Sequence, residues 1–463
     1  MLLRPVSYSV LRVRTIHLAL QALQTWEELM MSNDPLFKQW VDGNPFIMAL
    51  ENLKLTEPEL MSKLEERDDL QAGFSGAPES IRRIGLSKKF FVPPEYSYEL
   101  YERIYHLMLV GYLNRHPKTD DYDKYLHDID AGKQSIKNVP KPTSLVDAGT
   151  SMLMLGRSGH GKTKEVDKIL SCFELNNHFH PPSEETGGRR VPQVLWIKVF
   201  IKSTSSKRPF LLSILNAIDE KLGSNLASRL PSATVGDEII YVIKMCRMVG
   251  LGMIVVDDVQ FVLNANKTKD AKKLTNEFLE DLYNDLGIPM FFIGTPEVTD
   301  LFADKNQPEQ TERRLISDGL FRVQDYTADS ATWNELVEAT MLNFLGLQRD
   351  WLNQNLKSML FYYCEGNVSK LKRLTEFLLT EKQKLTKKNL PERIYHAHCE
   401  THIRSESIKP KLKGLQVVSS IDKQVKEVAA GTKEPSEPIP VDAKLQARNE
   451  RVRAMLDQDM EVE

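Results

Sequence analysis

The sequence lacks several features that would restrict its function at once. Its four cysteines, Cys172, Cys246, Cys364 and Cys399, are widely spaced and form no Cys-x-x-Cys pair. This excludes a disulfide scaffold and indicates reduced thiols in a cytosolic compartment. No apolar stretch approaches the roughly 18 residues of a membrane span, so we expect no membrane partner. The net charge of −3 provides no overall basic field, so any nucleic-acid contact must come from local patches.

The composition is that of an ordinary globular protein. Of 463 residues, 41% are hydrophobic and 27% charged, and this length predicts about three domains. Residues 1–26 contain three arginines and no acid, which imitates an organelle presequence. They lack the apolar centre and cleavage site of a secretion signal. The alternative, which we favour, is a translated upstream stretch with the start at Met30 or Met31.

The eight residues Gly156–Thr163 determine most of what the sequence predicts about function. This stretch matches the phosphate-loop pattern Gly-x-x-x-x-Gly-Lys-Thr and lies between an apolar strand and an amphipathic helix, the context that the motif requires. Its backbone N–H groups would surround phosphate oxygens. We expect Lys162 to reach the β- and γ-phosphates of ATP and Thr163 to bind Mg²⁺. The predicted nucleotide-binding residues are Gly156, Arg157, Ser158, Gly159, His160, Gly161, Lys162, Thr163 and Lys164.

Two acids close the third predicted strand, at the edge where open α/β sheets place their sites. Phosphoryl transfer needs one carboxylate that holds Mg²⁺ through water and a second that positions the attacking water. We assign Asp257 to the metal and Asp258 to the water.

Further candidates follow the fourth strand. Thr295 would lie beside the γ-phosphate, although Gly-Thr-Pro is also a common turn. Arg313 or Arg314 could act as a finger on a neighbouring subunit's nucleotide, or form a surface ion pair.

Two basic segments are candidates for contact with the phosphate backbone of DNA. Hydroxyls mixed with lysine and arginine suit such contact, although solvated surface is an equal alternative. Their residues are Lys202, Ser203, Thr204, Lys207, Arg208, Lys267, Lys269, Lys272 and Lys273. His396, His398, Cys399 and His402 share a predicted helix, but no second cluster completes a zinc site at recognised spacing, so an ordinary helix surface is expected.

The alternation of elements predicts the fold class α/β. From residue 141 to 330 strands and helices alternate, which indicates a parallel five-stranded sheet with flanking helices. Residues 331–405 contain only helices and are expected to form a helical lid subdomain. Residues 31–140 form an N-terminal region, expected to bind a partner, and 406–463 a flexible C-terminal tail with a possible terminal helix.

Together these motifs resemble an AAA+ ATPase, and they are most similar to the TnsC/TniB regulators of DNA transposition, of the TnsABC type. The narrower likeness rests on three features: the strand end Ile254-Val-Val-Asp-Asp-Val-Gln260, Asn44-Pro-Phe-Ile47 and Gly111-Tyr-x-x-Arg-x-Pro-Lys-Thr119. It runs from about residue 42 to about residue 400.

This resemblance implies an ATP- and magnesium-dependent homo-oligomer, a ring of hexamer or heptamer type or a filament, on double-stranded DNA. It also implies three protein partners: a TnsD/TniQ-type target selector, a TnsB-type transposase and a TnsA-type endonuclease. Two residues depart from the pattern. Asp258 replaces the usual Glu, and Ser369 stands where many AAA+ lids have Arg, so that a lid contact to the γ-phosphate either falls to Lys370 or is absent.

Three other functions remain open: a helicase loader or origin protein, a nucleotide-gated DNA scaffold that barely hydrolyses ATP, and a small-molecule phosphotransferase.

Overall fold

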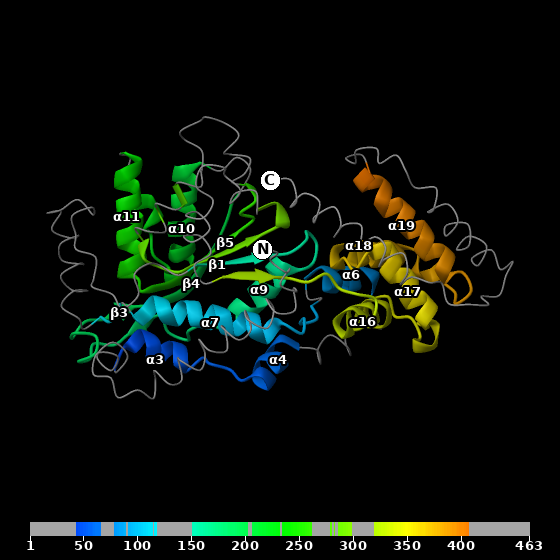
Figure 1. Ribbon diagram of the computed structural model, residues 1–463, viewed down its shortest axis with the longest axis horizontal. Coiled ribbons are helices and arrows are strands. Elements are labelled where there is room, and N and C mark those ends of the chain that lie inside the picture. Colours follow the sequence, from blue (N-terminus) through cyan, green and yellow to red (C-terminus); the bar gives the residue numbers. More distant parts are fainter. Residues whose placement is uncertain are drawn as a thin grey trace, which may run out of the picture.

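Two bodies lie side by side along the long axis of the molecule, an α/β body and a helical one (Figure 1). In this computed structural model the described residues are 43–65, 78–88, 91–113, 115–117, 151–201, 206–231, 234–261, 278–279, 282, 286–298 and 319–406. Among them, no helix is long and apolar enough to cross a membrane.

The α/β body is built on one parallel sheet. Its strands are β1 (Ser151–Leu155), β4 (Val194–Phe200), β5 (Leu251–Asp257), β6 (Met290–Gly294) and β7 (Leu320–Arg322). They lie in the order β4-β5-β6-β1-β7, and every neighbouring pair is parallel. This arrangement confirms the predicted fold class. It also places the carboxyl ends of β5, β6 and β1 next to one another, so the three segments predicted to carry the chemistry converge at one edge.

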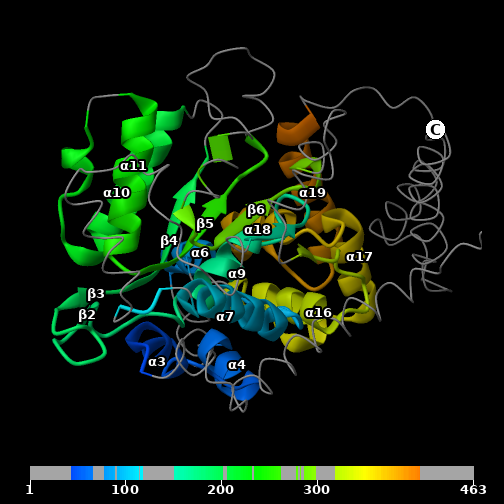
Figure 2. The same ribbon diagram turned by 60° about the vertical axis from the view of Figure 1, so that its left-hand side comes forward.

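Helices cover both faces of the sheet, which explains why its strands read as continuous apolar runs. Helices α10 (Lys207–Leu222) and α11 (Val235–Met248) pack on one face. The other face is covered by α9 (Lys162–Leu170), which follows the phosphate loop, and by α7 (Ser97–Leu113). Alternate residues of β5 enter the two cores, Ile254 and Val256 on one side and Met253 and Val255 on the other. Figure 2 shows the two layers.

The N-terminal region has no core of its own among the residues described. Helices α3 (Pro45–Glu51), α4 (Glu57–Glu65) and α7 share the core of one sheet face. Helix α6 (Glu79–Lys88) instead packs on the helical body, whose core takes in Leu86 and Val92. The region therefore spans both bodies.

The helical body follows the sheet, as the sequence predicts, and forms one core. Its first helix, α16 (Ala331–Glu338), continues into a π-helical segment, η4 (Ala339–Phe344). The buried Arg82 of α6 donates hydrogen bonds to the carbonyls of Phe344 and Leu345 at the end of this segment. The remaining elements are η5 (Arg349–Trp351), α17 (Gln354–Cys364), α18 (Val368–Thr380), η6 (Lys382–Lys384) and α19 (Leu390–Glu406).

Three short elements complete the α/β body. A hairpin of β2 (Phe179–His180) and β3 (Val191–Pro192) precedes β4, and the 3₁₀ turns η2 (Ala227–Arg229) and η3 (Pro296–Val298) follow α10 and β6.

The Asn44 and Gly111 motifs meet at the amino end of β5. The Asn44 side chain caps α3 and donates to the Tyr112 carbonyl at 3.2 Å, and the rings of Phe46 and Tyr112 lie 5.2 Å apart. The Tyr112 hydroxyl donates to the Gly250 carbonyl at 2.9 Å, and Arg115 donates to the Leu251 carbonyl. These contacts join the N-terminal helices to the sheet, which gives the motifs a packing role.

Candidate nucleotide site

The phosphate loop has the backbone that its glycines allow. Gly159 and Gly161 have φ values of +84° and +88°, a left-handed conformation that other residues rarely adopt. Gly161 is the N-cap of α9 and makes no side-chain capping hydrogen bond. A helix N-terminus of this kind, joined to a curled loop, is suited to bind phosphate. Lys162 and Thr163 lie in the first turn of α9, as predicted.

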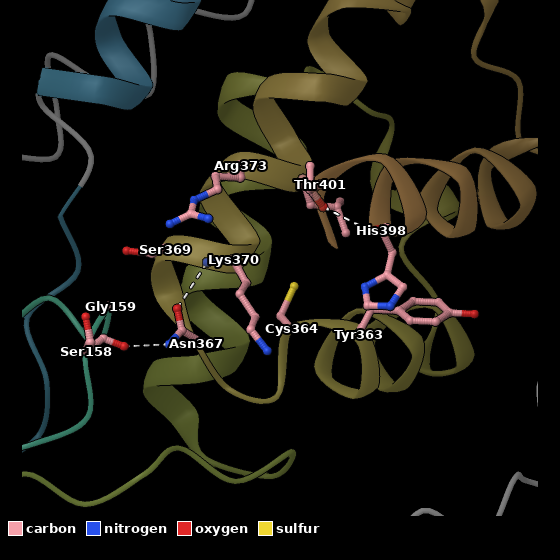
Figure 3. Close-up of a pocket in the computed structure, with 11 residues that line it drawn as sticks. Ser158, Gly159, Tyr363, Cys364, Asn367, Ser369, Lys370, Arg373, His398 and Thr401 are labelled. Carbon is pink, nitrogen blue, oxygen red and sulfur yellow. Dashed lines mark hydrogen bonds between the residues drawn. The ribbon is translucent and has the colours of Figure 1, made fainter. Parts of the chain in front are cut away.

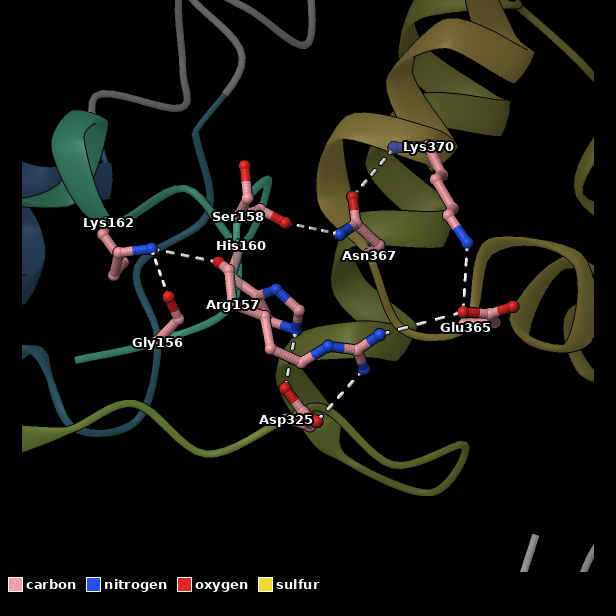
Figure 4. Close-up of polar contacts among 9 residues, drawn as sticks. All are labelled: Gly156, Arg157, Ser158, His160, Lys162, Asp325, Glu365, Asn367 and Lys370. Atoms are coloured by element: carbon pink, nitrogen blue, oxygen red, sulfur yellow. Dashed lines mark hydrogen bonds and ion pairs between the residues drawn. The ribbon is translucent and has the colours of Figure 1, made fainter. Parts of the chain in front are cut away.

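Lys162 is buried at the centre of the site. Its Nζ donates to the Gly156 carbonyl at 2.5 Å and to the Arg157 carbonyl at 3.0 Å (Figure 4). Burial lowers the pKa of Lys162, while the carboxylates of Asp257, Asp258 and Glu297 act in the opposite direction. The electrostatic contact with these acids shows that the loop and the ends of β5 and β6 form one site.

The two acids after β5 have different surroundings. Asp257 is 2% exposed; its Oδ1 accepts a hydrogen bond from the Asp258 N–H at 2.9 Å, and its Oδ2 lies 3.1 Å from Lys198 Nζ. Asp258 has a φ of +61°, and its Oδ1 accepts a hydrogen bond from Gln260 Nε2 at 2.9 Å. The carboxylate predicted to position water is therefore bound to the side chain two residues later, on a strained backbone.

Thr295 lies just after β6, at the same edge of the sheet. Its side chain hydrogen-bonds Glu297, and this bond is the largest cause that lowers the pKa of the Glu297 carboxyl. Lys162 contributes to the same shift. Glu297 is not among the residues predicted from the sequence, although it lies two positions after Thr295.

The phosphate loop is bonded directly to the helical body. Asn367 Nδ2 donates to the Ser158 carbonyl at 2.8 Å, and the Ser369 N–H donates to the Gly159 carbonyl at 3.0 Å. Ser369, which replaces the expected arginine, therefore contacts the loop through its backbone. Lys370 lies 3.0 Å from Glu365 Oε2 and so has an acidic partner within the helical body.

The variable residues of the loop add a chain of charges to this contact (Figure 4). Arg157 lies 3.2 Å from Asp325 and 3.8 Å from Glu365. The buried His160 places Nε2 3.0 Å from Asp325 Oδ1, and its ring stacks on Tyr326. Contacts with His160 and Arg157 lower the pKa of the Asp325 carboxyl.

A cavity of about 280 Å³ opens where the loop meets the helical body. Figure 3 shows the labelled side chains of α17, α18 and α19 around it, with Ser158 and Gly159 at one end. Its lining includes Lys370, Arg373 and His398 but no carboxylate, which suits an anionic group. The rings of His398 and Tyr363 lie 4.5 Å apart, and the described residues contain no cluster of three potential metal ligands.

Helix α9 also carries a buried carboxyl group, that of Glu165, three residues after Lys162 of the phosphate loop. Glu165 is 2% exposed and accepts a hydrogen bond from Ser97 Oγ of α7 at 3.2 Å. Burial raises the pKa of its carboxyl to about 8. Lys164 is partly buried, and burial together with Lys372 and Lys168 lowers its pKa to about 8. The first turns of α9 are thus in contact with the N-terminal region and with the charges of α18.

Several predicted residues are not brought into the site. Lys207 and Arg208 begin α10 rather than lying in a loop, and Arg208 forms an ion pair with the buried Glu238 and donates to the Pro231 carbonyl at 2.9 Å. Nine predicted site residues lie outside the described residues: Arg313, Arg314, Lys202, Ser203, Thr204, Lys267, Lys269, Lys272 and Lys273.

The residues present fit Mg-ATP. The loop and the uncapped start of α9 would hold the phosphates, with Lys162 among their oxygens. The Thr163 hydroxyl would bind Mg²⁺, and the Asp257 carboxylate would hold it through water; both supply the oxygen atoms that Mg²⁺ prefers. Bound Mg²⁺ would neutralise charge on the phosphates during transfer.

Three comparisons bear on the identity of this site. The sequence model of the bacterial TniB protein family matches residues 136–324. Two solved structures are similar to this chain at a low level. The ORC2 protein of Aeropyrum pernix, in ADPNP–ADP complexes, has a TM-score of 0.38 and 14% identity, over 69% of this chain and 72% of its own. Drosophila ORC bound to DNA has a TM-score of 0.38 and 13% identity, over 89% and 90%. Curated proteins give no match.

The family match covers the sheet, the phosphate loop and the acidic strand end, and it confirms the resemblance that the motifs carried. Within residues 136–324, the described residues form the parallel sheet with its phosphate loop, and this part of the chain is similar to the bacterial TniB protein family.

Proposed function

We propose that this chain is an ATP-dependent regulator of DNA transposition that assembles as a homo-oligomer on double-stranded target DNA. In that role it links a TnsD/TniQ-type target selector to a TnsB-type transposase and its TnsA-type endonuclease. The observation that carries the proposal is the coincidence of a complete phosphate site with the TniB family match over the same residues.

Contacts of the phosphate loop with the helical body support a link between nucleotide state and assembly. The phosphate loop is bonded to α18 through Ser158 and Gly159, and α6 of the N-terminal region packs against α18. A change in the loop on binding a triphosphate would therefore act on the helical body and the N-terminal region together. Such coupling is what nucleotide-dependent assembly requires.

DNA contact is proposed to come from the segments at 202–204 and 267–273, with backbone rather than base contacts. The ion pair of Arg208 with buried Glu238 argues against a free role for that arginine. Arg313 or Arg314 remains the proposed finger toward a neighbouring subunit.

Binding to a labelled duplex of arbitrary sequence tests the proposal. We expect tight binding with a non-hydrolysable triphosphate, weak binding with ADP, and a steep loss of affinity with salt because phosphate contacts release counterions. Replacement of Lys267, Lys269, Lys272 and Lys273 by glutamine should flatten the salt slope. Equal binding in all nucleotide states would contradict the proposal.

A scaffold that binds ATP but turns it over slowly is a second candidate, and Asp258 favours it. Its side chain is shorter than glutamate, its φ is +61°, and its Oδ1 is bound to Gln260. Asp258→Glu should raise the turnover rate if this geometry limits hydrolysis, and a phosphate-release assay measures it.

A further inference from the structure

One charged side chain is built into the sheet beside the acidic end of β5. Lys198 lies in β4 among apolar neighbours, and its side chain is only 9% exposed. Its ammonium lies 3.1 Å from Asp257 Oδ2 on the adjacent strand and 2.6 Å from Asp167 Oδ1 on α9. Lys198 therefore connects β4, β5 and the helix that follows the phosphate loop.

This lysine completes the surroundings of Asp257. One carboxylate oxygen accepts the Asp258 N–H, and the other faces the Lys198 ammonium. A carboxylate that is 2% exposed is costly to bury without an opposite charge. Lys198 supplies that charge from within the protein, at the carboxylate that we assign to Mg²⁺.

Asp167 gives the same ammonium a second acceptor. Its carboxylate is closer to Lys198 than that of Asp257 is, and its side chain is 52% exposed. Lys198 can consequently give up Asp257 without becoming an unpaired buried cation.

We propose that Lys198 is a positioning residue that competes with Mg²⁺ for Asp257 and so sets how much Mg²⁺ the site needs. The proposal rests on the Mg-ATP site described above. Without metal, Lys198 holds the carboxylate in place; with metal, Lys198 yields Asp257 and keeps Asp167. Two positive charges at one carboxylate repel each other, so the lysine opposes metal binding.

Mg²⁺-dependent binding of a fluorescent ADP analogue to the full chain tests this competition without relying on turnover. Lys198→Met keeps the length of the side chain and removes its charge, so the half-saturating Mg²⁺ concentration should fall about tenfold. Lys198→Arg keeps the charge and should restore the wild-type requirement. Asp167→Asn removes the alternative acceptor and should raise the requirement about twofold, the opposite direction.

Lys221→Met is the matched control, because Lys221 forms an ion pair of the same 2.6 Å length with Glu174 away from the acids. It should leave the Mg²⁺ requirement unchanged. An unchanged or higher requirement in Lys198→Met overturns the proposal. If that variant does not fold, equal requirements in wild type and Asp167→Asn overturn it instead. Wild-type protein that binds no analogue at any Mg²⁺ concentration would contradict the nucleotide site itself, and this inference with it.

Discussion

The two ends of strand β5 show how differently one strand can use polar groups. At its amino end, the carbonyls of Gly250 and Leu251 accept hydrogen bonds from Tyr112 and Arg115, which fix the N-terminal helices to the sheet. At its carboxyl end, Asp257 and Asp258 carry negative charge toward Lys162 and Lys198. The polar groups at the amino end stabilise the fold, whereas those at the carboxyl end form part of the candidate ligand site.

The comparison predicts that changes at the two ends separate stability from nucleotide chemistry. Tyr112→Ala should have the largest effect, because the fully buried ring packs on Phe46 and its hydroxyl is bonded to Gly250. We expect a loss of about 3–5 kcal/mol in the free energy of unfolding, as for other buried aromatic truncations. Urea denaturation measures it. Tyr112→Phe is the control and should cost only about 1 kcal/mol, and equal losses in the two variants would contradict this assignment.

Lys162→Ala tests the opposite end. Loss of a buried cation among the phosphate oxygens should reduce turnover by roughly 10²–10³-fold, with little change in the midpoint of thermal unfolding. A phosphate-release assay and a melting curve on the same preparation check both. A large loss of stability would show that the lysine holds the fold and would break the comparison.

Glu165 predicts a pH dependence, since its folded pKa of about 8 lies above the ordinary value of 4.5. The folded state binds the proton more tightly than the unfolded state does, so stability falls as pH rises from about 4.5 to about 8. Glu165→Gln should remove this decline and stabilise the protein by about 4–5 kcal/mol at pH 8.5, since one pKa unit corresponds to about 1.4 kcal/mol. Denaturation at several pH values measures it, with exposed Glu99→Gln as the control. Parallel stability curves for wild type and Glu165→Gln would contradict the assigned pKa.

Arg157→Ala should have the smallest effect. Its side chain is 45% exposed, and it pairs with Asp325 and Glu365 at the contact between loop and helical body. Exposed ion pairs contribute about 0–1 kcal/mol, and salt screens them. We expect a loss below about 1 kcal/mol that disappears in high salt, measured by denaturation at two ionic strengths. A larger, salt-independent loss would show that the loop depends on this arginine.

The two ends of β5 also differ in how far the sequence predicts them. Lys162, Asp257 and Thr295 each follow an apolar strand, and parallel strands bring their carboxyl ends to one edge, so their convergence follows from local pattern and topology. The Asn44 and Gly111 motifs could be recognised from their residue types and spacing, but nothing in these patterns indicated that the two motifs pack against each other. Their contact depends on how α3 and α7 fold back on the sheet.

Ion pairs between residues far apart in the sequence also could not be predicted from the sequence. Lys198 interrupts an apolar strand, and this signal could have selected it, but its two acidic partners come from separate elements. Arg208 was predicted to contact DNA. Its actual partner, Glu238, lies on a different helix, so the sequence around Arg208 does not indicate this ion pair. Periodicity describes the face of one element, whereas ion pairs depend on which elements become neighbours.

Electron microscopy of the purified full chain with duplex DNA tests the central claim most directly. The samples would contain ATP, a non-hydrolysable analogue or ADP, with Lys162→Ala as the matched variant. The account predicts rings or filaments on DNA with either triphosphate, and none with ADP or with the variant. Dispersed particles under every condition would contradict it.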